Sequence, residues 1–506
     1  HEIVMICRDY EPEQYPFVAR AVAYDAQGNP TELFTQETKT AGKVTLHQLP
    51  RTSIYPVYIQ DKQRDGHVKS FPEMSAEELK EYHDAMVATV KRVLKDDRPD
   101  ILHANHLVYQ PIVAAEACKE AGVPFYVVPH GSSIEYTVNE DDRFKAAARK
   151  GLEAAQGVAW IAREVRDRVY KLFPDLKEQV VAKSQMVGVG TDTSLFAPVA
   201  KSERRASLDT LKALHVPGGK TAALRDELKR RLDEGDVEAT RAYWDAYNHK
   251  LADDDLPTIL DDIPVEEDLL FFVGAMTYGK GIQSLLAAMP GILARHPKTH
   301  LVLVGSVTYR EVLEAIIHAL ATGNEPLFDS LAAKGKDLER SSATGGLEDL
   351  QAYAKDPAHR KVLFGAGPAL AKHIHILGRL DHPKLRRVFP CCEIGVFPSV
   401  IKEASPLVFA ESLANSVLPT GSYHSGLRDG LDDLRGHLND DKLWEKMKLP
   451  VEPEGRIQGM IDNLSGLLDD LGAEDRSERL RAIAEDNYDW RAIAEKLVDA
   501  ARKMIA

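Results

Sequence analysis

The stretch Glu403-Ala-Ser-Pro-Leu-Val-Phe-Ala-Glu411 joins a loop to the start of a helix. Ser405 is a favourable N-cap and Pro406 a favourable first helical residue. The apolar residues that follow, at helical spacing, predict a helix that begins here. The run before the loop, residues 393–398, is apolar and predicts a strand. Glu403 is therefore expected in the loop, and Glu411 about two turns inside the helix.

This layout suits a phosphorylated ligand that is rich in hydroxyl groups. The free backbone N–H groups at a helix start, here residues 406–408, favour an anion. In a doubly wound sheet, ligands bind at the carboxyl ends of the strands. The alternative is an ordinary strand-to-helix connection with two solvated glutamates, and the stretch alone leaves both interpretations open.

Length and composition indicate a soluble protein of two domains. At 506 residues the chain exceeds what a single hydrophobic core supports. Hydrophobic residues make up 44% and charged residues 28%, and the net charge of −14 argues against nucleic acid as a main partner. No apolar run approaches the ~20 residues of a membrane-spanning helix, whereas peripheral membrane contact and a homodimer stay open.

The cysteines and the first residues bear on location. The four cysteines do not form the pattern of a disulfide framework, so we expect a reducing, cytoplasmic setting. Residues 1–7 predict a strand rather than a signal peptide. Because the sequence begins with His1, we expect that the native start is missing or trimmed.

Strand-like runs alternate with amphipathic helices in two parts of the chain. Residues 1–198 form the first part, which includes a helix predicted from Ser75 with a capping box at Glu78. Residues 268–484 form the second part. This alternation predicts α/β domains with parallel sheets and helices on both faces. We expect the ligand in the crevice between the two domains.

Residues 199–267 separate the two parts and are dominated by charge. Helices are predicted at 220–232 and 239–251, and neither has a wide apolar stripe. We therefore expect a helical insertion on the surface. Its acidic run, residues 253–255, is expected to face solvent rather than to bind a cation.

Polar and glycine residues follow several of the predicted strands. His130-Gly131-Ser132 follows a buried strand in the first part, and Asn105-His106 follows another. In the second part, a strand leads into residues 274–280, which begin with glycine and end with lysine, and another strand leads into Gly378-Arg379. Glycine permits close backbone approach and lysine is suited to a phosphate.

In this order and spacing, the segments resemble glycosyltransferase family 4, the group 1 glycosyltransferases, which are retaining sugar-nucleotide enzymes of the GT-B fold. The resemblance is carried by Phe272-Val-Gly-Ala-Met-Thr-Tyr-Gly-Lys-Gly281, Ile376-Leu-Gly-Arg-Leu380, Phe397-Pro-Ser399 with the two glutamates, and residues 189–196 as the end of the first domain. It implies an α/β chain with two Rossmann-like domains facing across a cleft. It also implies that the C-terminal helix, residues 485–506, packs back on the first domain.

The resemblance implies a role for each site residue. Glu403 is expected to contact hydroxyls of the donor sugar, Glu411 the ribose hydroxyls, and Lys280 the diphosphate. His130 is expected beside the reactive carbon of the transferred sugar. The full donor-side set is Gly131, Gly274, Lys280, Gly378, Arg379, Leu380, Glu403, Ser405, Pro406, Leu407, Val408 and Glu411. Asn105, His106 and Ser132 are candidates for the acceptor side, with solvated loop positions as the alternative.

The expected chemistry needs neither a metal ion nor a cofactor. Cationic and N–H groups offset the negative charge that grows on the leaving diphosphate. The departing phosphate oxygen then deprotonates the acceptor on the same face, which retains the configuration at the sugar carbon. His373-Ile-His375 resembles part of a zinc site, but without a third ligand a structural role is expected.

The chain departs from the family pattern at three places. Ala275 stands where the family has an arginine, Ser405-Pro406 replaces a common Phe-Gly, and the loop 8–15 lacks the usual glycines. The expected function is hexosyl transfer from a UDP-, GDP- or ADP-sugar to a sugar, a glycan or a small hydroxyl acceptor. The alternatives are a GT-B epimerase or phosphorylase and a catalytically inactive sugar-nucleotide-binding protein, which Ala275 favours.

Overall fold

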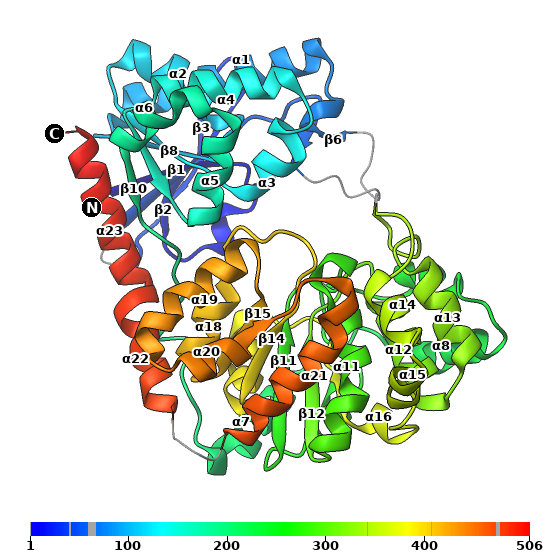
Figure 1. Ribbon diagram of the computed structural model, residues 1–506. Coiled ribbons are helices and arrows are strands. Elements are labelled where there is room, and N and C mark those ends of the chain that lie inside the picture. Colours follow the sequence, from blue (N-terminus) through cyan, green and yellow to red (C-terminus); the bar gives the residue numbers. More distant parts are fainter. Residues whose placement is uncertain are drawn as a thin grey trace. The chain divides into compact units, whose positions relative to one another are not determined.

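The computed structural model describes residues 2–39, 42–58, 67–341, 343–405, 407–471 and 476–505. The chain divides into two compact units (Figure 1). Unit 1 contains His1–Gly188 and Ala494–Ala506, and unit 2 contains Val189–Ile493. The boundary between the units thus lies after residue 188, whereas the sequence predicted it at residue 198. Among the described residues, no helix combines the length and the apolar character needed to cross a lipid bilayer.

Unit 2 is built on a six-stranded parallel sheet in the order β13-β12-β11-β14-β15-β16. The strands are β11 (Asp268–Val273), β12 (Thr299–Val304), β13 (Ile374–Ile376), β14 (Ile394–Phe397), β15 (Leu418–Ser422) and β16 (Lys448–Leu449). Counted within the unit, the order is 3-2-1-4-5-6, which is the doubly wound Rossmann order. The order reverses between β11 and β14, so their carboxyl ends form the switch point at which such sheets bind ligands.

Helices precede and connect these strands and pack against the sheet. They are α7 (Arg204–Ala213), α8 (Ala222–Asp233), α9 (Ala239–Ala242), α10 (Leu256–Asp261), α11 (Ile282–Arg295), α12 (Arg310–Thr322), α13 (Glu325–Lys334), α14 (Glu348–Ala354), α15 (Pro357–Leu363), α16 (Ala369–Lys372), α17 (His382–Val388), α18 (Leu407–Ala414), α19 (Ser425–Leu438), α20 (Asp441–Met447), α21 (Pro453–Asp469) and α22 (Ser477–Tyr488).

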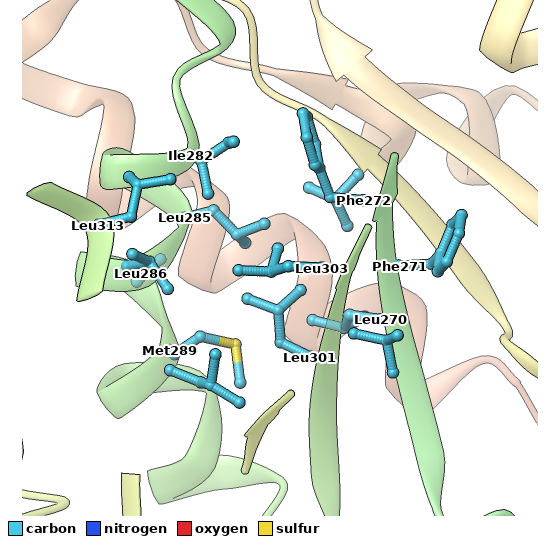
Figure 2. Packing of buried hydrophobic residues seen from close by; sticks show 14 of the residues in the cluster. Leu270, Phe271, Phe272, Ile282, Leu285, Leu286, Met289, Leu301, Leu303 and Leu313 are labelled. Atoms are coloured by element: carbon cyan, nitrogen blue, oxygen red, sulfur yellow. The ribbon is translucent and has the colours of Figure 1, made fainter. Parts of the chain in front are cut away.

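The core of unit 2 packs helices against both faces of β11 and β12. Figure 2 shows Leu301 and Leu303 beside the buried Leu285, Leu286 and Met289 of α11. Phe271 points to the opposite face, where its ring centroid lies 4.3 Å from that of Phe389. Each fully buried aliphatic side chain contributes ~1.5–3 kcal/mol to folding. The core therefore holds rigidly the strands whose carboxyl ends carry the candidate site.

Unit 1 contains two four-stranded sheets, β1-β4-β2-β3 and β10-β9-β8-β7, and the pair β5-β6. The strands are β1 (Glu2–Cys7), β2 (Val18–Tyr24), β3 (Pro30–Thr35), β4 (Lys43–Gln48), β5 (Tyr55–Val57), β6 (Val68–Ser70), β7 (Leu102–Asn105), β8 (Phe125–Val128), β9 (Gly157–Trp160) and β10 (Ser184–Met186). The expected parallel sheet is thus divided, and β3 runs antiparallel to β2. The turn between β2 and β3 is too short for the crossover that a parallel pair needs.

The helices of unit 1 include one that begins directly after Ser75, as the sequence predicts. They are α1 (Ala76–Asp97), α2 (Gln110–Ala121), α3 (Gly131–Ser133), α4 (Asp142–Ala154), α5 (Arg163–Leu172) and α6 (Lys177–Ala182). The capping box of α1 is confirmed, because Oγ of Ser75 accepts from the N–H of Glu78 at 3.2 Å and Oε2 of Glu78 accepts from the N–H of Ser75 at 2.9 Å. In α23 (Trp490–Ile505), residues 494–506 belong to unit 1, and Met504 packs on Gly157.

The charged segment 199–267 is not a surface insertion, contrary to the sequence-based expectation. Leu208, Leu211, Leu228, Leu232, Leu256 and Leu260 are buried in the core of unit 2. The helix expected at 239–251 is reduced to α9 and a short 3₁₀ turn. Asp253, expected to face solvent, is fully buried and pairs with Arg310. The expectation failed because the partners of these charges lie far away in the sequence.

Candidate functional site

The loops after β11 and β14 meet at the switch point through Lys280 and Glu403. Nζ of Lys280 donates to Oε1 of Glu403 at 2.6 Å, and Oγ of Ser399 donates to the same oxygen at 2.5 Å. The side chains of Lys280 and Glu403 are 29% and 21% exposed, so the pair is accessible from solvent. The sequence placed both residues in a donor site, and the structure brings them into contact.

Backbone contacts hold the loop of Glu403 against the loop that follows β11. The N–H of Val400 donates to the carbonyl of Gly279 at 2.9 Å. Gly281 has a φ of 70°, and a Cβ there would lie 1.9 Å from the carbonyl oxygen of Pro398. Only glycine fits at this position, because a side chain would push the two loops apart.

A third loop, after β15, fixes Glu403 from another direction. The N–H of Glu403 donates to Oγ of Ser425 at 3.0 Å, and its carbonyl accepts from the N–H of Gly426 at 2.9 Å. Nε2 of His424 lies 2.9 Å from the carbonyl oxygen of Ser399. Glu403 is therefore held by its backbone and its side chain, which orients its carboxylate before any ligand binds.

Glu411 lies inside α18, and its side chain is 12% exposed. Nε2 of His382 lies 3.9 Å from Oε1 of Glu411, and the residues that the structure describes donate no hydrogen bond to this carboxylate. Burial raises the pKa of Glu411 above its ordinary value, and His382 opposes the rise only in part. A carboxylate in this position gains from hydroxyl donors that a ligand supplies.

The start of α18 was expected to offer backbone N–H groups to a ligand. The N–H of Leu407 donates to the carbonyl of Ser405 at 3.1 Å, and its role toward a ligand stays a prediction. Pro406 lies outside the described residues, and a proline has no N–H to donate. The roles of Ser405 as N-cap and of the Val408 N–H as donor stay predictions.

Gly378-Arg379-Leu380, the expected base-binding turn, follows β13. Gly378 has a φ of 75°, and its carbonyl accepts from the N–H of Gly305 at 2.8 Å. The N–H of Asp253 donates to the carbonyl of Leu377 at 3.2 Å, and a Cβ on Gly378 would lie 2.7 Å from Oδ1 of Asp253. The turn therefore needs glycine, because residues 251–253 lie directly against it.

Arg379 and Leu380 line a cavity of about 550 Å³ in unit 2. Lys250, His215 and His382 line it as well. His382 also faces Glu411, so the base turn and Glu411 border the same region of unit 2. This cavity is large enough for a nucleoside portion of a ligand.

A buried ion network fixes residues 251–253 against the turn. Nη1 of Arg310, in α12, donates to Oδ1 of Asp253 at 2.6 Å, and Nη1 of Arg225 donates to Oδ2 at 2.8 Å. Nζ of Lys220 donates to Glu311 at 2.9 Å and to Glu314 at 2.7 Å. Burial opposes the charge on Arg310, but Asp253 and Glu314 outweigh it and raise the pKa of Arg310. The network thereby positions the base turn.

Two further positions complete the donor side. Gly274 follows β11 with a φ of 155°, and its N–H donates to the carbonyl of Val304 at 3.1 Å. Ala275 beside it is exposed and carries no charge. Lys280 is therefore the cation that the β11 loop contributes to the switch point.

The candidates of unit 1 gather at the carboxyl ends of β7 and β8. Nε2 of His130 lies 3.1 Å from Oδ1 of Asn105, and its ring centroid lies 4.7 Å from that of His106. These three residues line a cavity of about 590 Å³ within unit 1. Gly131 and Ser132 form the start of α3, directly after His130.

Burial favours the neutral form of the histidines that line this cavity. Burial lowers the pKa of His103 and of His106 to about 4, and it lowers that of His130 as well. A neutral imidazole offers one hydrogen-bond donor and one acceptor. Among the described residues that line the cavity, none is an aspartate or a glutamate, so these residues supply no carboxylate general base.

A larger cavity, about 1,320 Å³, lies at the amino ends of β11, β12 and β13, away from the switch point. Nδ1 of His300 lies 3.0 Å from Nε2 of His375, and Nδ1 of His373 lies 2.9 Å from the carbonyl oxygen of Thr299. Within the described ranges, no three histidine, cysteine or acidic side chains are arranged to hold a metal ion. These histidines bond instead to neighbouring protein groups.

Several site residues escaped prediction. Ser399 belongs to the Phe-Pro-Ser segment that identifies the loop, and its position four residues before Glu403 was a usable signal. His382 begins a helix capped by Asp381, which marks a strand-to-helix loop. Ser425 and Asp253 gave no signal, because their contacts are made with residues distant in the sequence.

Comparisons with known proteins agree with this geometry. Residues 261–328 match a family model described as glycosyl transferases group 1. A stretch of 63 residues is 41% identical to an uncharacterized glycosyltransferase of Methanocaldococcus jannaschii, and it spans 12% of this chain and 16% of that protein.

Two solved structures are similar over most of the chain. A sucrose-phosphate synthase from Thermosynechococcus elongatus is 15% identical, with 100% of this chain and 99% of that chain covered and a TM-score of 0.51. HepE from Anabaena, in complex with UDP, is 12% identical over 82% of each chain, with a TM-score of 0.48. The likeness to the synthase shows the fold, so this chain has the GT-B fold with two Rossmann-like domains.

Proposed function

We propose that the chain is a retaining glycosyltransferase that moves a sugar from a nucleotide-diphosphate sugar to a hydroxyl acceptor without a metal ion. The observation that carries the proposal is the contact of Lys280 with Glu403 at the switch point between β11 and β14. It places a cation and a fixed carboxylate where doubly wound sheets bind ligands. The match to the group 1 model includes β11 and Lys280, which supports the assignment.

The proposed donor site has a charged end and a base end. Lys280 has three N–H donors, of which one serves Glu403, so the others are available to the diphosphate. As the sugar bond breaks, negative charge grows on the diphosphate and the attraction of Lys280 strengthens. Glu403 binds hydroxyls of the donor sugar, and Glu411 binds those of the ribose. The turn 378–380 lines the base.

Retention of the configuration at the sugar carbon is proposed because the candidate carboxylates are assigned to binding the donor rather than to activating the acceptor. Glu403 is engaged by Lys280 and Ser399. In the cavity of His130, none of the described lining residues carries a carboxylate that would activate an acceptor for inversion. The diphosphate oxygen then serves as the base from the face of the bond being broken. His130 is proposed to contact the transferred sugar, as in the family that the sequence resembles.

The test combines binding with product analysis. Titrations with UDP, GDP and ADP, followed by their sugars, identify the donor, and release of the nucleoside diphosphate in the presence of sugar acceptors measures transfer. Proton NMR of the product's anomeric signal should show an α-linked product from an α-linked donor. A β-linked product would overturn the mechanism.

A sugar-nucleotide-binding protein without turnover is the second candidate. Ala275 favours it, because the β11 loop then supplies one cation where two would hold a diphosphate better. Donor binding without transfer or hydrolysis, over a broad set of acceptors, would support this candidate. Conversion of the donor to an epimer, detected by the same NMR experiment, would support an epimerase instead.

Location in the cytoplasm remains part of the proposal. Cys7, Cys118, Cys391 and Cys392 are free thiols, and all but Cys7 are buried. Unpaired thiols persist most readily in a reducing compartment. Fractionation of cells that express the native protein would test this.

A further inference from the structure

Arg8 is the one charged side chain among the described residues that line the cavity of unit 1. The described residues that line this cavity of about 590 Å³ are otherwise apolar, aromatic, amide, thiol or imidazole in character. Arg8 follows β1, whereas Asn105 and His130 follow β7 and β8, so three strand ends converge on the cavity. The volume lies in the range of small-molecule sites.

Among the described residues, no carboxylate neutralises Arg8. Its guanidinium carbon lies 4.7 Å from the ring centroid of Tyr55 and 4.8 Å from that of Tyr82. Its Nη2 donates to Oγ1 of Thr52 over a long 3.4 Å, and its Nε is buried without a hydrogen-bond partner. No described carboxylate lies within ion-pair distance of the half-buried Arg8, whereas the buried Arg204, Lys220 and Arg310 are each paired with a carboxylate. A guanidinium held in this way has donors to spare for an anion.

The other end of the cavity is suited to hydroxyl groups. Oδ1 of Asn105 lies 3.2 Å from Nε2 of His103 and 3.1 Å from Nε2 of His130. Nδ1 of His106 is buried without a partner. Neutral imidazoles and an amide exchange hydrogen bonds with hydroxyls without requiring a charge on the ligand.

A wall of aromatic rings connects the two ends. The ring of Tyr82, beside Arg8, lies 5.9 Å from that of Phe71, and Phe71 lies 5.3 Å from Tyr58. Tyr58 in turn lies 4.2 Å from the ring of His106. Such a wall favours the faces of a sugar ring and leaves the two polar ends to bind its substituents.

We propose that this cavity binds a small hydroxylated ligand that carries one anionic group, either a phosphate monoester or a carboxylate. Arg8 binds the anion, and Asn105 with the histidines binds the hydroxyls. If the proposed transfer activity holds, this ligand is the acceptor, which makes the acceptor an anionic sugar. The binding itself does not depend on that activity.

The test measures direct binding to the full chain by calorimetry, with no donor present. The probes are glucose, glucose 6-phosphate, glucuronate and inorganic phosphate. Glucose 6-phosphate or glucuronate should bind at least tenfold more tightly than glucose, which is about 1.4 kcal/mol. The better of the two identifies the anion, and inorganic phosphate should compete if it is phosphate. Added salt should weaken the charged probe more than glucose.

Variants locate the interaction. Arg8→Gln should weaken the charged probe at least tenfold and leave glucose unchanged, whereas Arg8→Lys should retain part of the difference. The matched control is Arg51→Gln, because Arg51 is also stacked on a tyrosine but is exposed and outside the cavity lining. Equal affinity for glucose and the charged probes in the unaltered protein overturns the proposal, as does an unchanged affinity in folded Arg8→Gln.

The nucleotide titrations keep this result separate from the proposed function. Binding of an anionic sugar together with failure to bind UDP, GDP or ADP would refute the donor site and leave this inference standing. If a nucleotide binds but glucose and the charged probes bind with equal affinity, this inference is refuted and the proposed donor site stands.

Discussion

Lys280→Ala tests the central contact of the proposed donor site. In a pair whose side chains are 29% and 21% exposed, the ion pair contributes only ~0.2–1 kcal/mol to folding. After the change, Ser399 still donates to Glu403, so the loop keeps one of its side-chain contacts. A hydrogen bond to a charged group is worth ~1.5–3 kcal/mol. We therefore expect nucleoside diphosphate affinity to fall about 10- to 150-fold while the fold is retained.

The assay compares a nucleoside with its diphosphate. If Lys280 contacts the phosphates, Lys280→Ala weakens the diphosphate and leaves the nucleoside unaffected. In turnover, it should lower kcat more than it raises KM, because the charge on the leaving group grows in the transition state. Lys446→Ala is the matched control, since Lys446 is similarly exposed and paired with Asp470 at 2.7 Å, away from the switch point.

Two outcomes would refute this reasoning. The first is an unchanged diphosphate affinity in a folded Lys280→Ala variant. The second is an equal loss for the nucleoside and the diphosphate, which would show a general distortion of the site. Melting temperatures of both lysine variants decide whether a loss comes from unfolding.

Further predictions concern the carboxylates and metal ions. Glu411→Ala should weaken nucleotide binding by about 1.5–3 kcal/mol, and an unchanged Kd would remove Glu411 from the site. Burial raises the pKa of Glu411 in the folded state above 4.5. The preference of the fold for the protonated carboxyl therefore contributes stability below that pH, and this stability is lost as pH rises through the folded-state pKa. Glu411→Gln should therefore raise the melting temperature more at neutral pH than near pH 5; an equal shift at both would contradict this. Asp253→Ala should cost about 3–5 kcal/mol in urea unfolding, because it removes the carboxylate that both terminal guanidinium nitrogens of buried Arg310 contact and leaves only the pair with Glu314, whereas the exposed Asp261→Ala should cost below about 1 kcal/mol. Transfer measured after EDTA treatment should be unchanged, and a loss restored by a divalent cation would refute metal independence.

The parts of the site that the sequence predicted are those built from short contiguous segments. The strand, loop and helix around Glu403 could be read locally, since turn, cap and apolar pattern all lie within a few residues. The parallel sheet of unit 2 followed from the alternation of strands and helices, whereas its strand order is known from the structure. The contact between Lys280 and Glu403 required only that the carboxyl ends of two strands meet at one edge of the sheet.

The parts that could not be predicted depend on pairing across the chain. The charge-rich segment 199–267 looked solvated, because a local pattern cannot show that Asp253 meets Arg310 in the core. The helices α7, α8 and α10 each bury only two leucines rather than a broad apolar stripe, so their apolar periodicity was weak. The hairpin of β2 and β3 was also missed, although the two strands are neighbours in the sequence and residues 25–29 join them directly.

Different interactions hold the two ends of the proposed donor site in place, and this difference affects the specificity for the base. The end with Lys280 and Glu403 is held by backbone hydrogen bonds and by Gly281, within loops that tolerate little change. At the base end, residues 251–253 form backbone hydrogen bonds with residues 377–379, and the buried ion pair of Asp253 with Arg310 holds residues 251–253 in place. Lys250 lines the cavity at the base end, but it takes part neither in the backbone hydrogen bonds around Glu403 nor in the buried ion pairs of Asp253. Substitutions at Lys250 can therefore alter the preference for a base while the groups proposed to act on the diphosphate and the sugar keep their geometry.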